Sequence, residues 1–524
     1  MQNNLLKLSQ QARIAVQHRD WTSVDMLAQK IQKLYSKDPE GYFLGGLVEK
    51  SSGRFESAAV AFSKSLTLDS RRYDAAVELA NQYLIMLRHN EAFELLCQHE
   101  LQLSNSPLYL DMAARVFSGL GLHSRAWSLF QKANQLQPGV DMFRANLAAC
   151  SVLLGKVKEA KTIYKSLLTK YPHHQQNHYE LSKLEKAIDA THVEQMQKIL
   201  ELTSLPPEKN IFMYYAIGKE LEDLGRWKES FHYYKLAGDA VLSVANYNVN
   251  DDIRVIEQII KTCDADWLST ERIPRSSEKQ AKTPIFIVGL PRTGTTLTER
   301  IISSHSQVES ADETFFMQMA IRHASGTGGI TDINEEIIEN ASQTDIHNIH
   351  QKYMDSVSYR LTDRPMFIDK YPYNFLYLGF IAKAFPDAHI IYLRRNPMDA
   401  CFAMFKQSFF KFAYSLEDLG HYYVAQDRLR THWQTVLGNR LIEVDYESMV
   451  ADQEGQTRKI LDKLGLEFEQ ACIDFEQNPA SSASASTLQV REKVHSRSIH
   501  KWKYFADELQ PLKKHLDAAG INTT

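Results

Sequence analysis

The feature that most constrains this chain is an internal repeat in its first half, with a period of about 34 residues. An alanine recurs at this spacing, and a large apolar or aromatic residue follows it four positions later. Four successive units carry the pair: Ala58 and Phe62, Ala92 and Leu96, Ala126 and Phe130, Ala160 and Tyr164. A short element that returns at a fixed period indicates one supersecondary unit used repeatedly.

Each unit is predicted to be two helices joined by a turn. The glycines at the turn mark the end of the first helix, where a left-handed residue is needed. The small alanine lets the second helix pack closely, and the residue four positions later lies on the same face. The turn slots are Gly53, Leu87, Gly121 and Gly155, and Pro138 and Pro172 close two of the units.

A later unit, LGRWKESFHYYKLA, places Gly225, Ser230, Tyr234 and Ala237 in the same register, about two periods after Gly155. The period and the residues resemble tetratricopeptide repeats. That resemblance implies a helical solenoid with a concave face that binds a peptide or a partner protein. An irregular helical bundle is the alternative.

Composition excludes several other classes of protein. Of 524 residues, 44% are hydrophobic and 24% charged, with a net charge of −4, which suits two globular domains and gives no basic excess for nucleic acid. No stretch approaches the ~20 apolar residues of a membrane span, and the amino terminus lacks a signal-peptide run. The five cysteines are scattered and never form a CxxC pair, which argues against a disulfide framework or a zinc site. We expect a soluble, cytoplasmic protein.

A phosphate-binding loop is predicted directly after a buried strand at residues 283–289. The loop 290–297 reads LPRTGTTL and leads into a helix, so that backbone N–H groups and threonine hydroxyls can face an anion. The spacing from Gly289 to Gly294 matches a Walker A loop, but the lysine that reaches the β- and γ-phosphates is replaced by Thr295. This substitution argues against a P-loop kinase, and a turn without any ligand is the other alternative.

With Arg292 inside it, the loop resembles the 5′-phosphosulfate loop of the sulfotransferases. Their donor is 3′-phosphoadenosine 5′-phosphosulfate (PAPS). The resemblance implies that the loop residues bind this donor: Arg292, Thr293, Gly294, Thr295, Thr296 and Leu297.

A second donor-binding segment is expected about 100 residues downstream. A buried strand at residues 388–393 ends before Arg395, Asn396 is predicted as a helix N-cap, and Pro397 as the first helical residue. This segment resembles the one that grips the 3′-phosphate in sulfotransferases, with Arg395 as the matching arginine; ordinary surface arginines are the alternative. Ala403 stands where the family has a serine and Gln407 where the tyrosylprotein members have an arginine, with Lys406 as a candidate to compensate.

The resemblance continues to the carboxyl terminus and is greatest to the tyrosylprotein sulfotransferases. Tyr446 follows a predicted strand at residues 441–445, as does the tyrosine that borders the nucleotide in that family. The serine, Gln-Val pair and Lys-Trp spacing near the end also match, and the Ser/Ala run at 480–485 is either a loop over the donor or a solvated linker. The implied donor-binding residues are Ser486, Gln489, Val490, Arg491 and Lys501.

The resemblance also assigns the chemistry. Glu313 follows Arg292 at the offset of the family's catalytic base, and a carboxylate has a task there because a phenol has a pKa of ~10. Its alternative role is to cap a helix that begins near Phe315, and His305 is a rival base that we expect to be structural. Lys370 matches the lysine that contacts the bridging oxygen; a salt bridge to Asp369 or another carboxylate is its alternative.

Arg292 is expected to offset the donor's negative charge, and Ser486 to contact the sulfuryl oxygens. No metal is required if arginine and lysine supply the positive charge. The expected fold is an all-α repeat solenoid followed by a P-loop-type α/β domain with a central parallel sheet, divided into residues 1–262, a linker at 263–283, and 284–524.

The predicted function is transfer of the sulfuryl group of PAPS to a hydroxyl, with a peptide tyrosine presented by the repeats as the favoured acceptor and a glycan or small alcohol as other candidates. The alternative is a repeat adaptor with a degenerate, donor-binding but inactive sulfotransferase domain.

Overall fold

The computed structural model describes residues 2–99, 106–270, 282–327, 333–478, 480 and 489–524. The chain divides into two compact units, Met1–Lys156 and Val157–Thr524. Within the described ranges, no helix has both the length and the apolar character needed to cross a bilayer.

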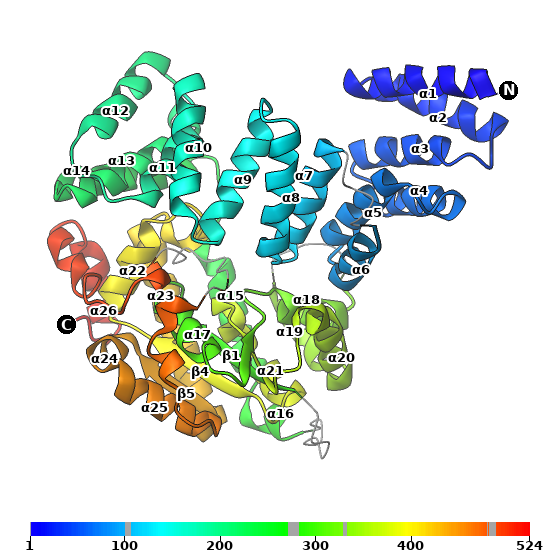
Figure 1. Cartoon of the computed structure of the whole chain (residues 1–524). Helices are drawn as coiled ribbons and strands as arrows, with labels where there is room; N and C mark the ends of the chain where they lie inside the picture. The colour runs from blue at the N-terminus through cyan, green and yellow to red at the C-terminus, as the bar shows by residue number, and fades with distance from the viewer. Residues whose placement is uncertain (1, 100–105, 271–281, 328–332, 479, 481–488) are drawn as a thin grey trace. The chain divides into compact units, whose positions relative to one another are not determined.

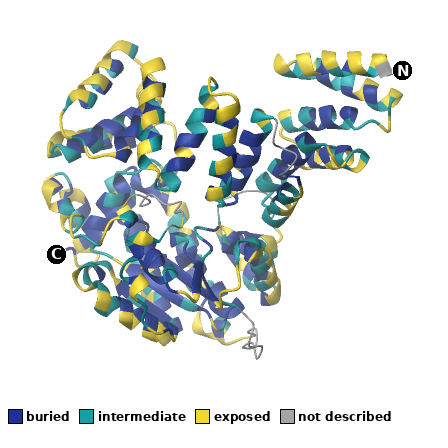
Figure 2. Cartoon of the chain, in the orientation of Figure 1, coloured by how far each residue is buried: buried dark blue, intermediate teal, exposed yellow. Residues whose placement is uncertain are grey.

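The first unit consists of helices that pack against their neighbours in sequence, drawn from blue to cyan in Figure 1. The buried faces of these helices point toward one another, and their exposed faces point outward (Figure 2). The helices are α1 (Gln2–Gln17), α2 (Trp21–Leu34), α3 (Glu40–Ser51), α4 (Phe55–Leu68), α5 (Tyr73–Ile85), α6 (His89–His99), α7 (Pro107–Gly119), α8 (His123–Leu136) and α9 (Asp141–Leu153).

The repeat register of the sequence is visible in the backbone. The turn glycines all have left-handed φ values between 71° and 77°, and Leu87 in the remaining slot is left-handed too, with φ of 60°. The alanines of the register are fully buried, and the large residues four positions later are at most 3% exposed. The predicted helical repeat is therefore confirmed.

One helix pair precedes the first repeat that the sequence revealed. Helices α1 and α2 meet at Arg19, which lies one repeat period before Gly53 and is left-handed with φ of 56°. Val24 and Ala28 occupy the alanine and aromatic slots of this pair and are fully buried. The pair keeps the geometry of the repeat but none of its signature residues, so the spacing of residue types did not reveal it.

Helical pairs continue into the second unit. Gly225, with φ of 73°, joins two of these helices, whereas α11 and α12 are joined without a glycine. The helices are α10 (Val157–Lys170), α11 (Gln175–Leu184), α12 (Thr191–Thr203), α13 (Ile211–Asp223), α14 (Trp227–Leu242), α15 (Val249–Thr262) and α16 (Ala265–Ser269).

A five-stranded sheet forms the core of the second unit, and all its strands are parallel, in the order β2-β3-β1-β4-β5. Phe286 of β1 pairs in register with Asp369 of β3, and Gly289 with Leu393 of β4. The carboxyl ends of these three strands therefore meet at one edge. The strands are β1 (Thr283–Gly289), β2 (Val308–Ser310), β3 (Met366–Asp369), β4 (His389–Arg394) and β5 (Leu441–Asp445).

Both faces of the sheet are covered, which is why its strands are nearly continuous apolar runs. On one face, Ile287 and Ile391 pack with Ile301 of α17 and Ile460 of α25. On the other, Phe286 packs against Tyr353 of α20. The helices are α17 (Thr295–Ser303), α18 (Phe316–Ala324), α19 (Glu335–Ser342), α20 (Ile346–Val357), α21 (Leu378–Ala384), α22 (Pro397–Phe405), α23 (Leu416–Leu437), α24 (Tyr446–Ala451), α25 (Gln453–Leu464) and α26 (Gln510–Ala518).

Short 3₁₀ helices connect these elements. They are η2 (Pro207–Lys209), η3 (Ser358–Arg360), η4 (Pro372–Tyr377), η5 (Lys411–Ala413), η6 (Gly438–Arg440), η7 (Gln470–Cys472), η8 (Phe475–Gln477), η9 (Gln489–Arg491) and η10 (Lys501–Phe505). The predicted fold class, a helical repeat region followed by an α/β domain with a parallel sheet, is confirmed. The limits proposed for the domains, 1–262, 263–283 and 284–524, stay a prediction.

Candidate active site

The loop between β1 and α17 is held by two glycines that no other residue could replace without strain. A Cβ at Gly289 would lie 2.6 Å from the carbonyl oxygen of Leu393, and φ at Gly289 is 140°. Gly294, with φ of 99°, is the N-cap of α17, and a Cβ there would meet the ring of Tyr446 at 2.5 Å. Arg292 is left-handed with φ of 68°. The backbone of this loop is thus pressed against β4 and the residue that follows β5.

The two predicted phosphate-binding arginines lie together. Arg395 donates from Nη1 to the carbonyl oxygen of Arg292 at 2.8 Å, and its guanidinium lies 4.8 Å from the ring centre of Tyr446. Arg292 donates from Nη2 to Gln489 Oε1 at 3.1 Å. Residues that the sequence placed in four separate segments therefore meet beside one loop.

Ser498 belongs to the same cluster, although the sequence analysis did not name it. Its carbonyl oxygen accepts a hydrogen bond from Arg395 Nη2 at 2.7 Å, and its hydroxyl lies 2.9 Å from the Tyr446 hydroxyl. No motif in the sequence singles out this serine. Its place follows from the path of the chain just before η10.

The local electrostatics favour an anion at this cluster. Burial and the nearby guanidinium of Arg395 lower the pKa of Arg292 to about 10. The Nε of Arg395 is buried, and within the described part of the chain no hydrogen-bond acceptor reaches it. A phosphate between these groups would offset their mutual repulsion and supply acceptors.

Lys370 is the most buried cation of the site. It follows β3 directly, has 0% exposure, and donates to Glu313 Oε1. A second carboxylate, Glu299 of α17, lies 3.4 Å away through Oε2. Burial by itself lowers the pKa of Lys370, but Glu299 and Glu313 outweigh that effect, so its pKa is raised and the ammonium stays charged.

Glu299 is a second residue that the sequence analysis missed. It is 7% exposed, and its Oε1 accepts a hydrogen bond from the Ser310 hydroxyl. Burial raises its pKa, while Lys370 acts in the opposite direction. A glutamate in the middle of the loop helix is an ordinary helix residue in the sequence, and only the approach of β3 gives it a role.

Asp369 fixes the turn that carries Glu313 and does not pair with Lys370. Its Oδ2 accepts from the hydroxyls of Thr314 and Tyr353, both at 2.8 Å, and its Oδ1 accepts from Asn374 at 3.3 Å. Burial raises the pKa of Asp369 to about 7. The structure thus places the carboxylate partners of Lys370 on α17 and the β2–α18 connection.

His305, the rival base, is held by its own surroundings. It is 1% exposed, its Nε2 lies 2.9 Å from the carbonyl oxygen of Glu467, and its Nδ1 accepts from the backbone N–H of Gln307 at 3.1 Å. Both ring nitrogens are therefore engaged, Nδ1 within the connection after α17 and Nε2 with the segment that follows α25.

The segment predicted to be the second donor-binding segment has the expected local structure. The side chain of Asn396 accepts from the N–H groups of Met398 and Asp399, and Pro397 begins α22.

Thr295 and Thr296 are buried in the first turn of α17, Leu297 packs against the sheet core, and Thr293 donates its hydroxyl to the carbonyl oxygen of Leu290. These four residues line or support the loop.

The remaining predicted residues lie near the carboxyl end. Val490 is buried, Arg491 donates to the carbonyl oxygen of Ala480 at 3.4 Å, and Lys501 pairs with Glu222 of α13. Ser486 and most of the Ser/Ala run lie outside the described residues. Across the described ranges, no group of three or more His, Cys, Asp or Glu is arranged to hold a metal.

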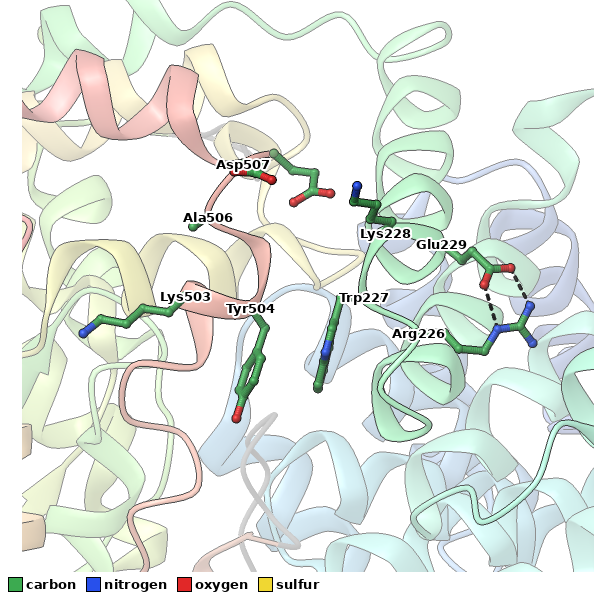
Figure 3. A pocket seen from close by; sticks show the side chains of 9 residues that line it. Arg226, Trp227, Lys228, Glu229, Lys503, Tyr504, Ala506 and Asp507 are labelled. Carbon is green, nitrogen blue, oxygen red and sulfur yellow. Dashed lines mark hydrogen bonds and ion pairs between the residues drawn. The ribbon is translucent and has the colours of Figure 1, made fainter.

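The described residues of the second unit form cavities at the loop and away from it. One of about 210 Å³ borders the loop and is lined by Leu290, Thr293, Arg394 and Arg395 among others. A larger one of about 360 Å³ lies between the start of α14 and the end of η10 and contains none of the predicted site residues (Figure 3). The smaller cavity, which adjoins the arginine cluster, is the one connected with the candidate site.

Comparison with known proteins identifies the same region. Residues 284–470 match the sulfotransferase family. An uncharacterized protein of Aquifex aeolicus (strain VF5) is 25% identical over 406 residues, which are 73% of this chain and 52% of that protein. The chain therefore spans about half the length of this relative. Protein-tyrosine sulfotransferase 1 of Danio rerio is 24% identical over 244 residues, which are 42% of this chain and 65% of that protein.

Solved structures with similar parts fall into two groups. The sulfotransferase domain of the Synechococcus PCC 7002 olefin synthase has a TM-score of 0.34 and 18% identity, covering 44% of this chain and 91% of that one. YrrB, a TPR protein with an unusual peptide-binding site, has a TM-score of 0.29 and 19% identity, covering 40% and 97%. Residues 284–470 of this chain thus match the sulfotransferase family, and they follow a region of repeated helix pairs.

Proposed function

We propose that this protein transfers the sulfuryl group of PAPS to a hydroxyl acceptor and releases 3′-phosphoadenosine 5′-phosphate. The observation that carries the proposal is the arrangement at one edge of the sheet. Lys370, paired with Glu313, follows β3; the loop of Arg292 follows β1; and Arg395 follows β4. These three strands are neighbours, so a phosphate-binding group and an acid–base pair share one edge.

The residues present fit such a donor. Arg292 and Arg395 are like charges in contact range, and the buried Nε of Arg395 needs an acceptor that the described residues do not supply. The ring of Tyr446 borders the loop at Gly294. A nucleotide with a 3′-phosphate and a 5′-phosphosulfate could bind both arginines through its phosphates. Lys370 would then be available to contact the sulfuryl group that is transferred.

The proposed chemistry assigns one task to each charged side chain. The donor supplies an activated sulfur whose bond to the bridging oxygen breaks while the acceptor oxygen bonds to sulfur. Glu313 takes the proton of the acceptor hydroxyl. Lys370 donates a hydrogen bond to the bridging oxygen as its negative charge grows, so that no metal is needed for this charge. Glu299 keeps the Lys370 ammonium charged and in place.

A phenolic acceptor is the favoured substrate within this proposal. Phe315, two residues after Glu313, is 57% exposed and meets the ring of Tyr371 edge-to-face at 4.9 Å. Tyr371 itself follows Lys370 in the chain, so both aromatic residues are sequence neighbours of the proposed base and its lysine. Aromatic rings prefer such edge-to-face and offset contacts, and a tyrosine ring would extend them. The protein-tyrosine sulfotransferases among the relatives support the same acceptor class.

The donor assignment is tested by calorimetric titration with 3′-phosphoadenosine 5′-phosphate. The wild-type chain should bind one equivalent, and Arg292→Ala and Arg395→Ala should each weaken binding at least tenfold, the equivalent of about 1.4 kcal/mol. Arg458→Ala is the matched control, because Arg458 is an exposed arginine of α25 paired with Glu454. Equal affinities for all four proteins would contradict the donor site.

The acceptor assignment is tested with ³⁵S-labelled PAPS and two acceptors, a tyrosine-containing peptide and a small alcohol. We expect label on the peptide, and Glu313→Gln should lower turnover by about 10²–10⁴-fold while leaving the affinity for the bisphosphate nearly unchanged. Label on the alcohol alone would contradict the tyrosine acceptor. Donor binding without transfer to any acceptor would favour the inactive adaptor instead.

A further inference from the structure

A buried carboxylate of the repeat helices, Glu222, pairs with two lysines near the proposed donor site. Glu222, near the end of α13, is 6% exposed. Its Oε1 lies 2.8 Å from Lys406 Nζ and also pairs with Lys501, and its Oε2 lies 3.0 Å from Lys406 Nζ. The Tyr234 hydroxyl donates to Oε2 at 3.0 Å. One carboxylate thus gathers two lysines that are distant from it in sequence.

Both lysines belong to segments of the candidate donor site. Lys406 directly follows α22, and its electrostatic neighbours include Arg292 and Lys501. Lys501 lies three residues after Ser498, whose carbonyl oxygen binds Arg395. Asp399, 2% exposed in the first turn of α22, accepts hydrogen bonds from the backbone N–H groups on either side of Lys501.

The contact between the repeat helices and these segments is closely packed. Trp227 of α14 stacks on Tyr504 of η10 with ring centres 4.4 Å apart, and the two rings face each other in Figure 3. Phe231 stacks on Phe405 at 5.6 Å. A Cβ at Gly238 would lie 2.3 Å from the carbonyl oxygen of Tyr414. Helix α14 therefore packs directly against α22 and η10, the elements beside Lys406 and Lys501.

We propose that Glu222 is a positioning residue of the donor site: it holds Lys406 and Lys501 side by side as charged groups for a phosphate of the bound nucleotide. The inference rests on the proposed function, since it needs the bisphosphate to bind beside Arg292 and Arg395. It makes the last repeat helices part of the donor site, in addition to any role in binding an acceptor.

The charge balance explains why a carboxylate is needed here. Burial lowers the pKa of Lys406, Glu222 acts against this, and Lys501 and Arg292 lower it further. Burial would raise the pKa of Glu222, but Lys406 and Lys501 bring it down to about 2, so the carboxylate stays ionised at all physiological pH values. The charged groups that act on Lys406 are thus Glu222 from the repeat helices, Arg292 from the loop and Lys501 from η10. Tyr234 contacts the other side of this cluster through its hydrogen bond to Glu222.

Removing the charge of Glu222 should therefore change both affinity and its pH dependence. In Glu222→Gln, Lys406 keeps the three influences that lower its pKa and loses the one that raises it. It should deprotonate at a lower pH, and a neutral lysine no longer attracts a phosphate. If Glu222 had a purely structural role, its replacement would change the affinity but not the pH at which binding is lost as Lys406 deprotonates.

The experiment is a titration with 3′-phosphoadenosine 5′-phosphate between pH 6.5 and pH 9.5, with thermal unfolding of each protein followed in parallel. In Glu222→Gln, we expect binding to weaken by roughly tenfold and to be lost at lower pH than in the wild type. Glu220→Gln is the matched control, because Glu220 is a buried glutamate of the same helix that pairs with His192 at 2.7 Å and touches neither lysine.

The outcomes separate this inference from the function on which it rests. Equal or tighter binding by Glu222→Gln, with an unmoved pH limb, overturns the inference while the donor site stands. Absence of binding by the wild type contradicts the proposed function and this inference with it. If Glu222→Gln does not fold, Glu222→Asp decides: its shorter side chain cannot reach both lysines, so wild-type affinity there overturns the inference.

Discussion

The repeat slots of the first unit and the carboxyl edge of the sheet hold their buried residues in different ways. In the repeat, the buried slots are filled by alanine and by large apolar side chains, and each position recurs once in every period. At the sheet edge, the buried residues include Lys370, Asp369 and Glu299, each of which occurs once. The repeat is therefore stabilised by side-chain volume, and side chains of similar size fill the same position in each unit. The site depends instead on buried charges, which are balanced only when particular partners lie next to each other.

The largest expected effect on turnover concerns the charge balance of the site. Lys370→Met removes the ammonium that we assign to the bridging oxygen, and loss of one such donor typically costs ~2.7–4 kcal/mol, so turnover should fall by about 10²–10³-fold. The measurement is the steady-state rate of label transfer from PAPS to the tyrosine peptide.

Lys383→Met is the control for this variant. Lys383 is also buried, but it donates to Thr270 at 3.0 Å, away from the loop. It should lower stability and leave the rate per folded molecule unchanged. Wild-type turnover by Lys370→Met would show that the site does not depend on this charge, and would contradict the difference drawn between the site and the repeat.

The largest expected effect on stability concerns the volume of the buried side chains in the repeat. Phe62→Ala and Phe130→Ala each empty the same slot in different units, and truncation of a buried phenylalanine costs about 3–5 kcal/mol. Urea unfolding followed by circular dichroism should give similar losses for both. Binding of the bisphosphate should not change, since the residues of the proposed donor site lie in the second unit.

Val60→Ala is the control, because Val60 is 71% exposed in the same helix as Phe62. It should change the free energy of unfolding by no more than about 0.5 kcal/mol in either direction. Very unequal costs for the two phenylalanines would show that the slots are not equivalent, despite their shared register.

A pH dependence of stability should mark the buried carboxyl at the sheet edge. The pKa of Asp369 is raised to about 7 in the folded chain, against an unfolded value of about 3.9. The folded state therefore binds the extra proton between these values, and stability falls as pH rises from about 4 to about 7, by up to ~1.4 kcal/mol per pH unit, and levels off above.

The measurement is the difference in unfolding free energy between the wild type and Asp369→Asn, taken across this range so that other titrations cancel. The difference should change with the stated slope. Thr314→Val removes a hydroxyl that lowers the pKa of Asp369, so it should extend the sloping region above pH 7. A flat difference for Asp369→Asn would contradict the raised pKa.

The smallest effect tests the turns of the repeat. Gly53→Ala places a Cβ in open space but at φ of 72°, so only the left-handed backbone opposes it, at a cost of about 1 kcal/mol. Gly139→Ala also meets open space, without a left-handed φ, and should be neutral or slightly stabilising. Thermal unfolding compares the two. Equal effects would show that turn conformation does not limit the repeat.

Local features of the fold were predictable because they depend on neighbours in sequence. The repeat register predicted the left-handed turns, and even Leu87, which lacks the signature, adopts one. Asn396 and Pro397 were recognisable as a helix start because capping involves residues two and three positions away. The sequence pattern did not reveal the pair α1–α2, because Arg19 and Val24 occupy the glycine and alanine positions of the repeat. They keep its backbone geometry without its characteristic residue types.

The sequence by itself determined the helical repeat, the strand-loop-helix around Arg292 and the family resemblance that suggests Glu313, Lys370 and Arg395. Only the tertiary structure decided what those residues touch. It brought Glu299 to Lys370, Ser498 to Arg395, and Glu222 to Lys406 and Lys501. The physical reason is that a buried charge selects its partner by distance in space, and the packing of helices and strands, which no local pattern encodes, sets that distance.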